Sequence, residues 1–191
     1  MDIIRKHYGT IELGSKVVLS DPCYDAGIWC SAELDNMMPG IYDCYADIAH
    51  CGEWGTRVVR LVVIPAESNN DIIYDHEVPT TLAVDAGVFG IYDSEYFCRH
   101  KKLDDEKWYN ENVISWISKE NAFICEEGKG FITESGYGDG CYCAYYSKNE
   151  KGQINSIEIV FIEPDYDDPD EYNIIDTVDA NTQVTKENFE N

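Results

Sequence analysis

The sequence has no long apolar run and no secretory signal. A helix that crosses a membrane needs about 20 consecutive apolar residues, and the chain of 191 residues contains no such stretch. The first ten residues, MDIIRKHYGT, carry charge but lack the apolar segment that follows the charge in a signal peptide. We therefore expect a cytoplasmic protein, in a bacterial cell or an infected host, with no membrane partner.

Basic residues are scarce. The chain has 14 Lys and Arg against 37 Asp and Glu, which gives a net charge of −23. Binding to the phosphates of nucleic acid needs clustered Lys and Arg, and so does binding to an anionic membrane surface, so the composition argues against both. Two interpretations of the acidity stay open: a well-solvated surface, or the attraction of a basic partner, in one form by imitating nucleic acid.

The eight cysteines lack the spacing of a metal site or of a disulfide framework. The sequence contains no CxxC pair, and the chain is too long for a disulfide-dense miniprotein. We therefore predict free thiols, no metal and no cofactor. Cys141 and Cys143 lie two apart in a predicted strand, so both side chains should point to one face.

The sequence is rich in short strand patterns separated by turns. Within residues 42–48, apolar residues alternate with Asp43 and Asp47, as in a strand with one buried face. The run at residues 55–64 is apolar throughout its second half, which is typical of a central strand, and Pro65 ends it. Further strands are predicted at residues 16–20, 81–87, 88–93, 129–135, 141–148 and 153–162. The last two are expected to form a hairpin.

One helix is predicted at about residues 104–119. Tyr109, Val113, Trp116 and Ile117 fall on one helical face, and Asp104 suits the N-cap position. The predicted fold class is α+β, mainly β, with antiparallel sheets in a sandwich or partly open barrel and this helix packed on the sheet.

The composition changes at Glu163. Residues 163–191 contain ten acidic residues and one lysine, so about nine of the net negative charges lie there. We predict a single β-rich domain at residues 1–162 and an acidic C-terminal tail at residues 163–191. The tail is expected to be partly disordered or docked through Ile174 and Ile175.

The first of three motifs that could carry chemistry is SDPCY, at residues 20–24, where a carboxylate and a thiol follow a strand end. Loops at strand ends often carry functional sites. A nucleophilic Cys23 would need a base, usually His, and no histidine has a sequence context that marks it as the partner. The structural alternative is that Asp21 caps the turn and Cys23 fills a small hole.

The second motif is VDAG at residues 84–87, which runs into GIYD at residues 90–93. Asp85 interrupts an apolar strand, and a charge at such a position must be paired or functional. The structural alternative is an ion pair with Arg57 or Arg60, or hydrogen bonds to loop amides.

The third motif is SGYGDG at residues 135–140. Its three glycines permit positive φ and close approach of the backbone. Such a loop can bind an anion through its N–H groups, or it can be a tight turn between strands. It lacks the Gly-Lys-Ser/Thr ending of a Walker A loop. Aromatic residues lie beside the three motifs and suit either ligand contacts or a core: Trp29, Trp54, Tyr137 and Tyr142.

Taken in order, the SDPCY, WGxRV, VDxGxxGI and SGYGDG motifs resemble an uncharacterised bacterial and phage family that is described only as a domain of unknown function. The resemblance covers about residues 16–162, and it implies one compact, mainly β domain without implying any activity. The family form of the second motif has glutamine after its glycine, where this chain has Val88, so no polar recognition is expected there. The positions that match the family motifs are Asp21, Cys23, Trp54, Arg57, Asp85, Gly87, Asp93, Gly138, Asp139 and Gly140.

These features favour a non-enzymatic binding protein, such as a phage or mobile-element accessory factor of the counter-defence or immunity type, that sequesters a host protein or a small ligand. One alternative is a hydrolase in which Asp21, Asp85 and Asp139 act with or without a metal, with Cys23 nearby. Another is a structural virion accessory protein. The predicted ligand-binding residues are Trp54, Arg57, Asp85, Asp93, Tyr137, Gly138, Asp139, Gly140 and Tyr142.

Overall fold

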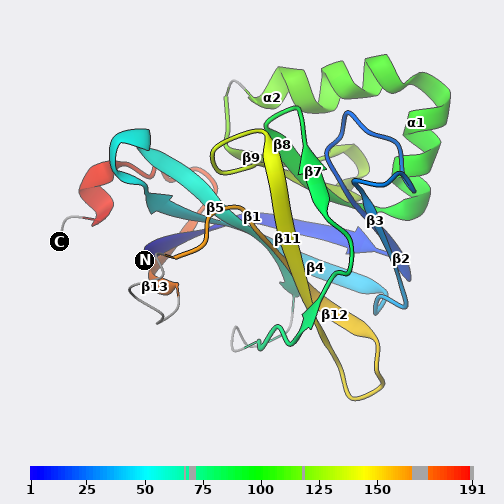
Figure 1. Cartoon of the computed structure of the whole chain (residues 1–191), viewed down its shortest axis with the longest axis horizontal. Coiled ribbons are helices and arrows are strands. Elements are labelled where there is room, and N and C mark those ends of the chain that lie inside the picture. Colours follow the sequence, from blue (N-terminus) through cyan, green and yellow to red (C-terminus); the bar gives the residue numbers. More distant parts are fainter. Residues whose placement is uncertain (67, 69–71, 118, 165–171, 190–191) are drawn as a thin grey trace.

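The protein is built from two stacked β-sheets and one helix (Figure 1). The structure is a computed structural model that describes residues 1–66, 68, 72–117, 119–164 and 172–189. The larger sheet has eight strands, of which β7 (Leu82–Val84) pairs only with β11. Its other strands lie side by side in the order β13 (Asn173–Asp179), β1 (Asp2–Leu13), β4 (Gly40–His50), β5 (Thr56–Pro65), β12 (Ile154–Val160), β11 (Gly140–Lys148) and β6 (His76–Glu77).

The smaller sheet is antiparallel throughout. Its five strands lie in the order β3 (Ala32–Asp35), β2 (Lys16–Ser20), β8 (Val88–Asp93), β10 (Gly130–Glu134) and β9 (Ala122–Ile124). The predicted α+β, mainly β fold is therefore confirmed, with β2 at the predicted residues. The predicted β11–β12 hairpin and the central position of β5, between β4 and β12, are confirmed as well.

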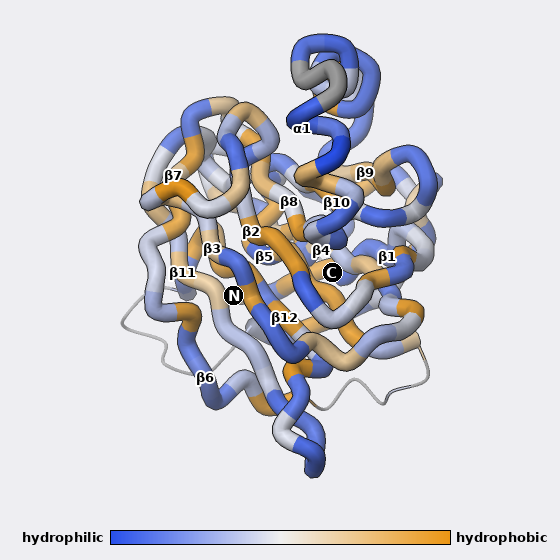
Figure 2. Tube along the Cα trace, turned by 90° about the vertical axis from the view of Figure 1, so that its right-hand side faces the viewer, coloured by the Kyte–Doolittle hydropathy of each residue, from blue (hydrophilic) through white to orange (hydrophobic). Residues whose placement is uncertain are grey.

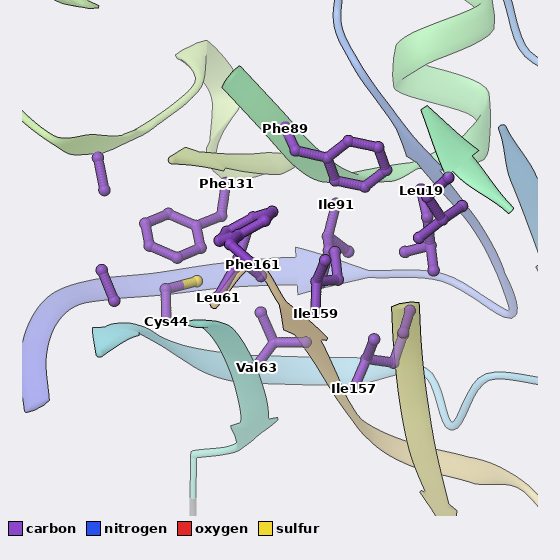
Figure 3. Packing of buried hydrophobic residues seen from close by; sticks show 14 of the residues in the cluster. Leu19, Cys44, Leu61, Val63, Phe89, Ile91, Phe131, Ile157, Ile159 and Phe161 are labelled. Carbon is purple, nitrogen blue, oxygen red and sulfur yellow. The ribbon is translucent and has the colours of Figure 1, made fainter. Parts of the chain in front are cut away.

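The main core lies between the two sheets. Figure 3 shows Phe89, Phe131 and Phe161 packed with aliphatic side chains from both layers. On β2, Val17 and Leu19 face this core, whereas Val18 between them faces the helix side. This alternation is the period of two that a strand imposes, and here both faces of the smaller sheet are buried.

The helix covers the outer face of the smaller sheet. It consists of α1 (Ser94–Tyr109), a π-helical turn η2 (Asn110–Ile114) and the short α2 (Ser115–Ile117). Tyr96, Phe97 and Trp108 pack on Tyr92 of β8. Gly90 and Gly130 leave the space for the Tyr92 ring, because a Cβ at either position would lie within 3 Å of it. The rest of α1 is largely hydrophilic (Figure 2).

The predicted helix boundary was wrong at its N-terminal end. The helix begins at Ser94, and its N-cap is Asp93, whose carboxylate accepts a hydrogen bond from the Tyr96 amide at 3.1 Å. Asp104 therefore lies inside the helix. The π-helical turn inserts an extra residue and rotates the helix surface, so Trp116 is 44% exposed instead of buried, although it stacks on Phe123. The side chain of Ile117 lies outside the described residues.

The C-terminal segment adds an edge strand to the larger sheet. Strand β13 pairs with β1 in parallel, the only parallel pair among the described strands of that sheet. Ile174 and Ile175 are 40% and 44% exposed, so the predicted docking through these two side chains was wrong. The segment is held by its backbone pairing with β1 and by Tyr172, Val184 and Phe189, which pack against the main core. Most of the acidic run that opens the predicted tail, residues 165–171, lies outside the described residues.

Three short 3₁₀ turns complete the fold: η1 (Gly52–Trp54), η3 (Glu126–Gly128) and η4 (Lys186–Phe189). Within the residues described, no helix is long and apolar enough to span a membrane. All eight cysteines are described and all are free.

Candidate functional site

The three sequence motifs meet at one place in the fold. The carboxylate of Asp21, in the first motif, accepts hydrogen bonds from the backbone amides of Asp85 and Ala86, in the second, at 2.8 and 2.7 Å. The amide of Ser135, which opens the third motif, donates to the Gly87 carbonyl at 3.1 Å. The second motif therefore lies between the other two. We call this meeting point the motif junction.

Asp21 holds the motif junction together. Its side chain is fully buried, and its other oxygen accepts a hydrogen bond from the Cys23 amide at 2.8 Å. A buried carboxylate is stable only when its charge is satisfied, and here three backbone amides satisfy it. Because both oxygens are occupied, Asp21 ties two loops together, and the hydrolase hypothesis loses one of its three carboxylates as a free acid or base.

Cys23 is exposed but unsuited to be a nucleophile. Partial burial, followed by its hydrogen bond and proximity to Asp21, raises the pKa of the Cys23 thiol to about 12. A nucleophilic cysteine needs the opposite shift and a base. Three of the four histidines contact other carboxylates: His7 contacts Asp43, His76 contacts Asp75, and His100 contacts Glu127.

Asp85 and Asp139 are the exposed carboxylates of the motif junction. Val84 pairs with Gly140 at the end of the β7–β11 ladder, so the next residues, Asp85 and Asp139, leave that ladder at the same end. Asp85 accepts a hydrogen bond from the Tyr24 hydroxyl, not the ion pair with Arg57 or Arg60 considered above. Among the described residues, no group of three or more His, Cys, Asp or Glu side chains could hold a metal ion.

The glycine loop of the third motif is a tight turn stabilised from within. Gly138 has φ of +105°, which favours glycine, and its amide donates to the Ser135 carbonyl at 2.9 Å. The Tyr142 hydroxyl donates to the carbonyls of Ser135 and Gly138, at 2.9 and 2.6 Å. The Gly138 amide already donates inside the turn, so it is not available to bind an anion. Tyr142 thus holds the glycine loop through these two hydrogen bonds, and β11 begins directly after the loop, at Gly140.

Two aromatic rings from different motifs lie together on the surface beside this loop. Trp54, from η1, and Tyr137, from the glycine loop, have ring centroids 5.3 Å apart. They remain 62% and 52% exposed. We call them the aromatic pair. Cys51 lies beside them, because a hydrogen bond with Tyr137 acts on its thiol and partly offsets the rise in pKa that burial causes.

The other predicted site residues lie elsewhere or have structural roles. Asp93 caps α1 and also accepts a hydrogen bond from the Gly14 amide at 3.0 Å. Arg57 donates to the neighbouring Thr56 carbonyl at 3.2 Å, and its charge lowers the pKa of Glu134 against the stronger effect of burial. Trp29 is 76% exposed in a separate loop, which is joined to β7 by the hydrogen bond from the Ala83 amide to the Cys30 carbonyl.

Sequence reasoning missed a buried ionic cluster on the outer face of the larger sheet. Asp47 is fully buried and binds the Arg5 guanidinium through two hydrogen bonds, at 2.7 and 2.9 Å. Arg60 lies 2.6 Å from Asp47 and 3.2 Å from Glu158, and it stacks on the Tyr172 ring. The available signal was the position of these charges inside strand patterns, with Asp47 in an alternating strand and Arg60 in an apolar run.

Comparison with known proteins gives one match. The model of a family described as "Protein of unknown function (DUF4241)" matches residues 64–159, half of the chain, from the end of β5 through nearly all of β12. This range contains the second and third motifs but not SDPCY or Trp54. No curated protein and no solved structure matches the chain.

Proposed function

The chain belongs to the DUF4241 family of proteins of unknown function, and we propose that this member is a non-enzymatic binding protein that takes up a basic segment of a partner protein at the aromatic pair. A factor of a phage or mobile element, of the counter-defence or immunity type, would use such a surface to sequester a host protein. The identity of the partner that carries the basic segment would then show which process the protein acts in.

The observation that supports this proposal is the exposure of the aromatic pair. Trp54 and Tyr137 contact each other, yet both are more than half exposed to solvent. Exposed large aromatic side chains that gather at one point are typical of protein contacts, where Trp and Tyr contribute most of the binding energy. The glycine loop fixes Tyr137 in place, so the surface is formed before a partner arrives.

The charge around the aromatic pair indicates a basic partner. Glu53 precedes Trp54, Asp139 follows two residues after Tyr137, and both carboxylates are exposed. The whole chain carries a net charge of −23. A Lys or Arg side chain placed over an exposed indole or phenol ring gains a cation–π interaction, and the neighbouring carboxylates would add charge complementarity.

The test is a binding comparison with matched variants. The full chain, the double variant Trp54→Ala/Tyr137→Ala and the control Trp116→Ala are each immobilised and exposed to an extract of the native cell. Captured proteins are identified by mass spectrometry, purified and titrated against each variant. Trp116 is the matched control because it is a partly exposed tryptophan on the helix.

We expect a partner with a basic surface segment that binds the wild type and the control equally. The double variant should bind it at least about thirtyfold more weakly, because the loss of even one hot-spot aromatic residue costs about 2 kcal/mol. Binding should weaken as salt rises from about 0.1 to 0.5 M, because salt screens exposed charges. A purified partner that binds the double variant as tightly as the wild type would contradict the proposal.

A further inference from the structure

A polar groove lies toward the end of β1 that is opposite the β1–β2 turn. The groove has a volume of 360 Å³. Lys6 of β1, Ile48 of β4 and Thr56 of β5 line one side, and two other segments complete it: residues 119–121 before β9, and residues 180–184 after β13. Figure 1 shows the C-terminal segment, in red, running beside the cyan hairpin of β4 and β5. We call it the lysine groove.

Lys6 is the unusual member of this lining. Its side chain points inward from β1, and the residue is only 6% exposed. Its nearest carboxylate oxygen is Glu120 Oε2 at 3.9 Å, which is too long for a hydrogen bond. The Nζ atom also lies 5.1 Å from the centroid of the Tyr8 ring. Among the described residues, the ammonium group therefore has no hydrogen-bond acceptor, although it is able to donate three hydrogen bonds.

The stem of Lys6 is buried, but its ammonium nitrogen is not among the solvent-inaccessible polar atoms that lack a partner, so it reaches the water of the groove and can exchange that water for a ligand. The same burial lowers the pKa of Lys6, against a smaller opposite effect of Glu120. The one ion pair of Lys6, with Glu120, is long at 3.9 Å, and a loose pair of this kind adds little stability. The position of Lys6 in the wall of a groove instead gives its donors access to a ligand.

The rest of the lysine groove is also suited to a small polar ligand. A second ammonium group is available from Lys119, and neutral donors and acceptors come from Thr56, Asn121, Asn181, Thr182 and Gln183. Glu120 is the single carboxylate in the lining, and its side chain is 44% exposed, so it has room to turn toward solvent. A volume of 360 Å³ lies at the small end of the range for ligand pockets, about 300 to 1,000 Å³.

We propose that the lysine groove binds a small anionic metabolite through a carboxylate or phosphate group, with Lys6 as the residue that pairs with the anion. The hydroxyl and amide side chains of the lining would contact the uncharged polar part of the ligand. The lysine groove shares no residue with the aromatic pair. Anion binding in the groove can therefore be tested independently of partner binding at the aromatic pair.

The test uses two simple anions as probes. Inorganic phosphate and citrate are titrated separately into the full chain by isothermal titration calorimetry, at constant ionic strength set with sodium chloride. The variant Lys6→Met keeps the length of the side chain and removes its charge, so it should fold. The matched control is Lys16→Gln, which removes an exposed lysine that pairs with Asp35 on β3.

We expect at least one probe to bind the wild type and Lys16→Gln equally, and to bind Lys6→Met about tenfold or more weakly, as loss of a charged hydrogen-bond partner predicts. The preferred probe then tells a phosphate site from a carboxylate site. The proposal is overturned if neither anion binds, or if Lys6→Met binds as tightly as the wild type. Should Lys6→Met fail to fold, Lys119→Gln decides: an unchanged affinity in that variant would also overturn it.

Discussion

Two carboxylates, Asp21 and Asp47, are fully buried in this protein, and the fold neutralises them in different ways. Asp21 lies where β2 ends and is bound by three backbone amides from two loops. Asp47 lies within β4 and is bound by two arginine side chains from the neighbouring strands β1 and β5. The first joins loops at the end of the strands, and the second joins strands on the outer face of the larger sheet.

The difference shows what each carboxylate can be used for. Backbone amides are fixed by the fold and cannot be removed by a side-chain substitution, so Asp21 is pre-organised and inert. The arginines of Asp47 are side chains, and with Glu158 they form a cluster of two positive and two negative charges. Removing one charge from that cluster leaves the others buried and unbalanced, whereas removing the charge of Asp21 leaves only neutral amides unsatisfied.

The largest effect is therefore expected for Asp47→Ala. It leaves the buried guanidinium groups of Arg5 and Arg60 without their shared carboxylate, which should lower the free energy of unfolding by about 3–5 kcal/mol. Urea unfolding followed by circular dichroism measures the loss. The control is Asp43→Ala, also on β4, which removes a partly exposed carboxylate hydrogen-bonded to His7 and should cost about 1 kcal/mol. Equal losses for the two variants would contradict the comparison.

A smaller loss of stability is expected for Asp21→Asn. Asparagine has one acceptor oxygen, so its NH₂ group must face a backbone amide that now donates to the carboxylate. We expect a loss of about 2 kcal/mol in the same urea experiment, the value of a hydrogen bond to a charged group. Asp85→Asn at the exposed neighbour should change stability by about 0.5 kcal/mol or less. A larger loss for Asp85→Asn than for Asp21→Asn would show that Asp21 does not hold the junction.

The smallest effect is chemical and leaves the fold intact. Because the pKa of Cys23 is raised to about 12, little thiolate exists near neutral pH, and iodoacetamide should alkylate it about a hundredfold more slowly than an unperturbed exposed cysteine. Mass spectrometry of peptides over time compares Cys23 with Cys141, which is also exposed. The Cys23 rate should keep rising as pH increases beyond 10. A rate that levels off by about pH 10, one unit above the ordinary thiol pKa, would show that the Cys23 thiol is unperturbed.

The local patterns of the sequence predicted eight of the thirteen described strands and missed β1, β3, β6, β9 and β13. Alternation identified β4, and an apolar run identified β5, because burial follows directly from their period. Strand β1 escaped because a bulge between His7 and Gly9 shifts its register. Tyr8 is the bulged residue itself and packs against the core, and Ile11 and Leu13 face the core after it, so a single period of two does not run through the strand.

The start of the helix could have been read from Asp93, which is a favoured N-cap residue and is followed two residues later by Glu95. The prediction assigned Asp93 to a strand motif. It located the helix from the apolar period of residues 109–117, which covers only the C-terminal part of the helix. The π-helical turn within that half explains why the period pointed to the exposed Trp116. The apolar pattern of the sequence gives no sign that a π-helical turn inserts an extra residue at Asn110–Ile114.

At the candidate site, the motifs identified the right loops but not the roles of their residues. The alternative hydrolase hypothesis grouped Asp21, Asp85 and Asp139 as acid, base or metal-binding carboxylates, and the fold does bring their loops together. The Asp21 carboxylate is buried and bound by three backbone amides, whereas Asp85 and Asp139 are exposed. The sequence pattern alone does not distinguish a buried carboxylate from an exposed one. The aromatic pair joins residues from η1 and from the loop before β11, and their contact depends on the packing of both turns.

The sequence by itself determined the large negative charge, the β-rich character and the scarcity of basic side chains, because these follow from composition and from short periodic patterns. Only the tertiary structure decided which charges are buried and what satisfies them. Asp47 meets Arg5 and Arg60 through the register of three neighbouring strands, and Lys6 faces a groove that the distant residues 180–184 help to close. Whether a charged side chain is buried depends on residues that are distant in the chain, so a local sequence pattern cannot predict it.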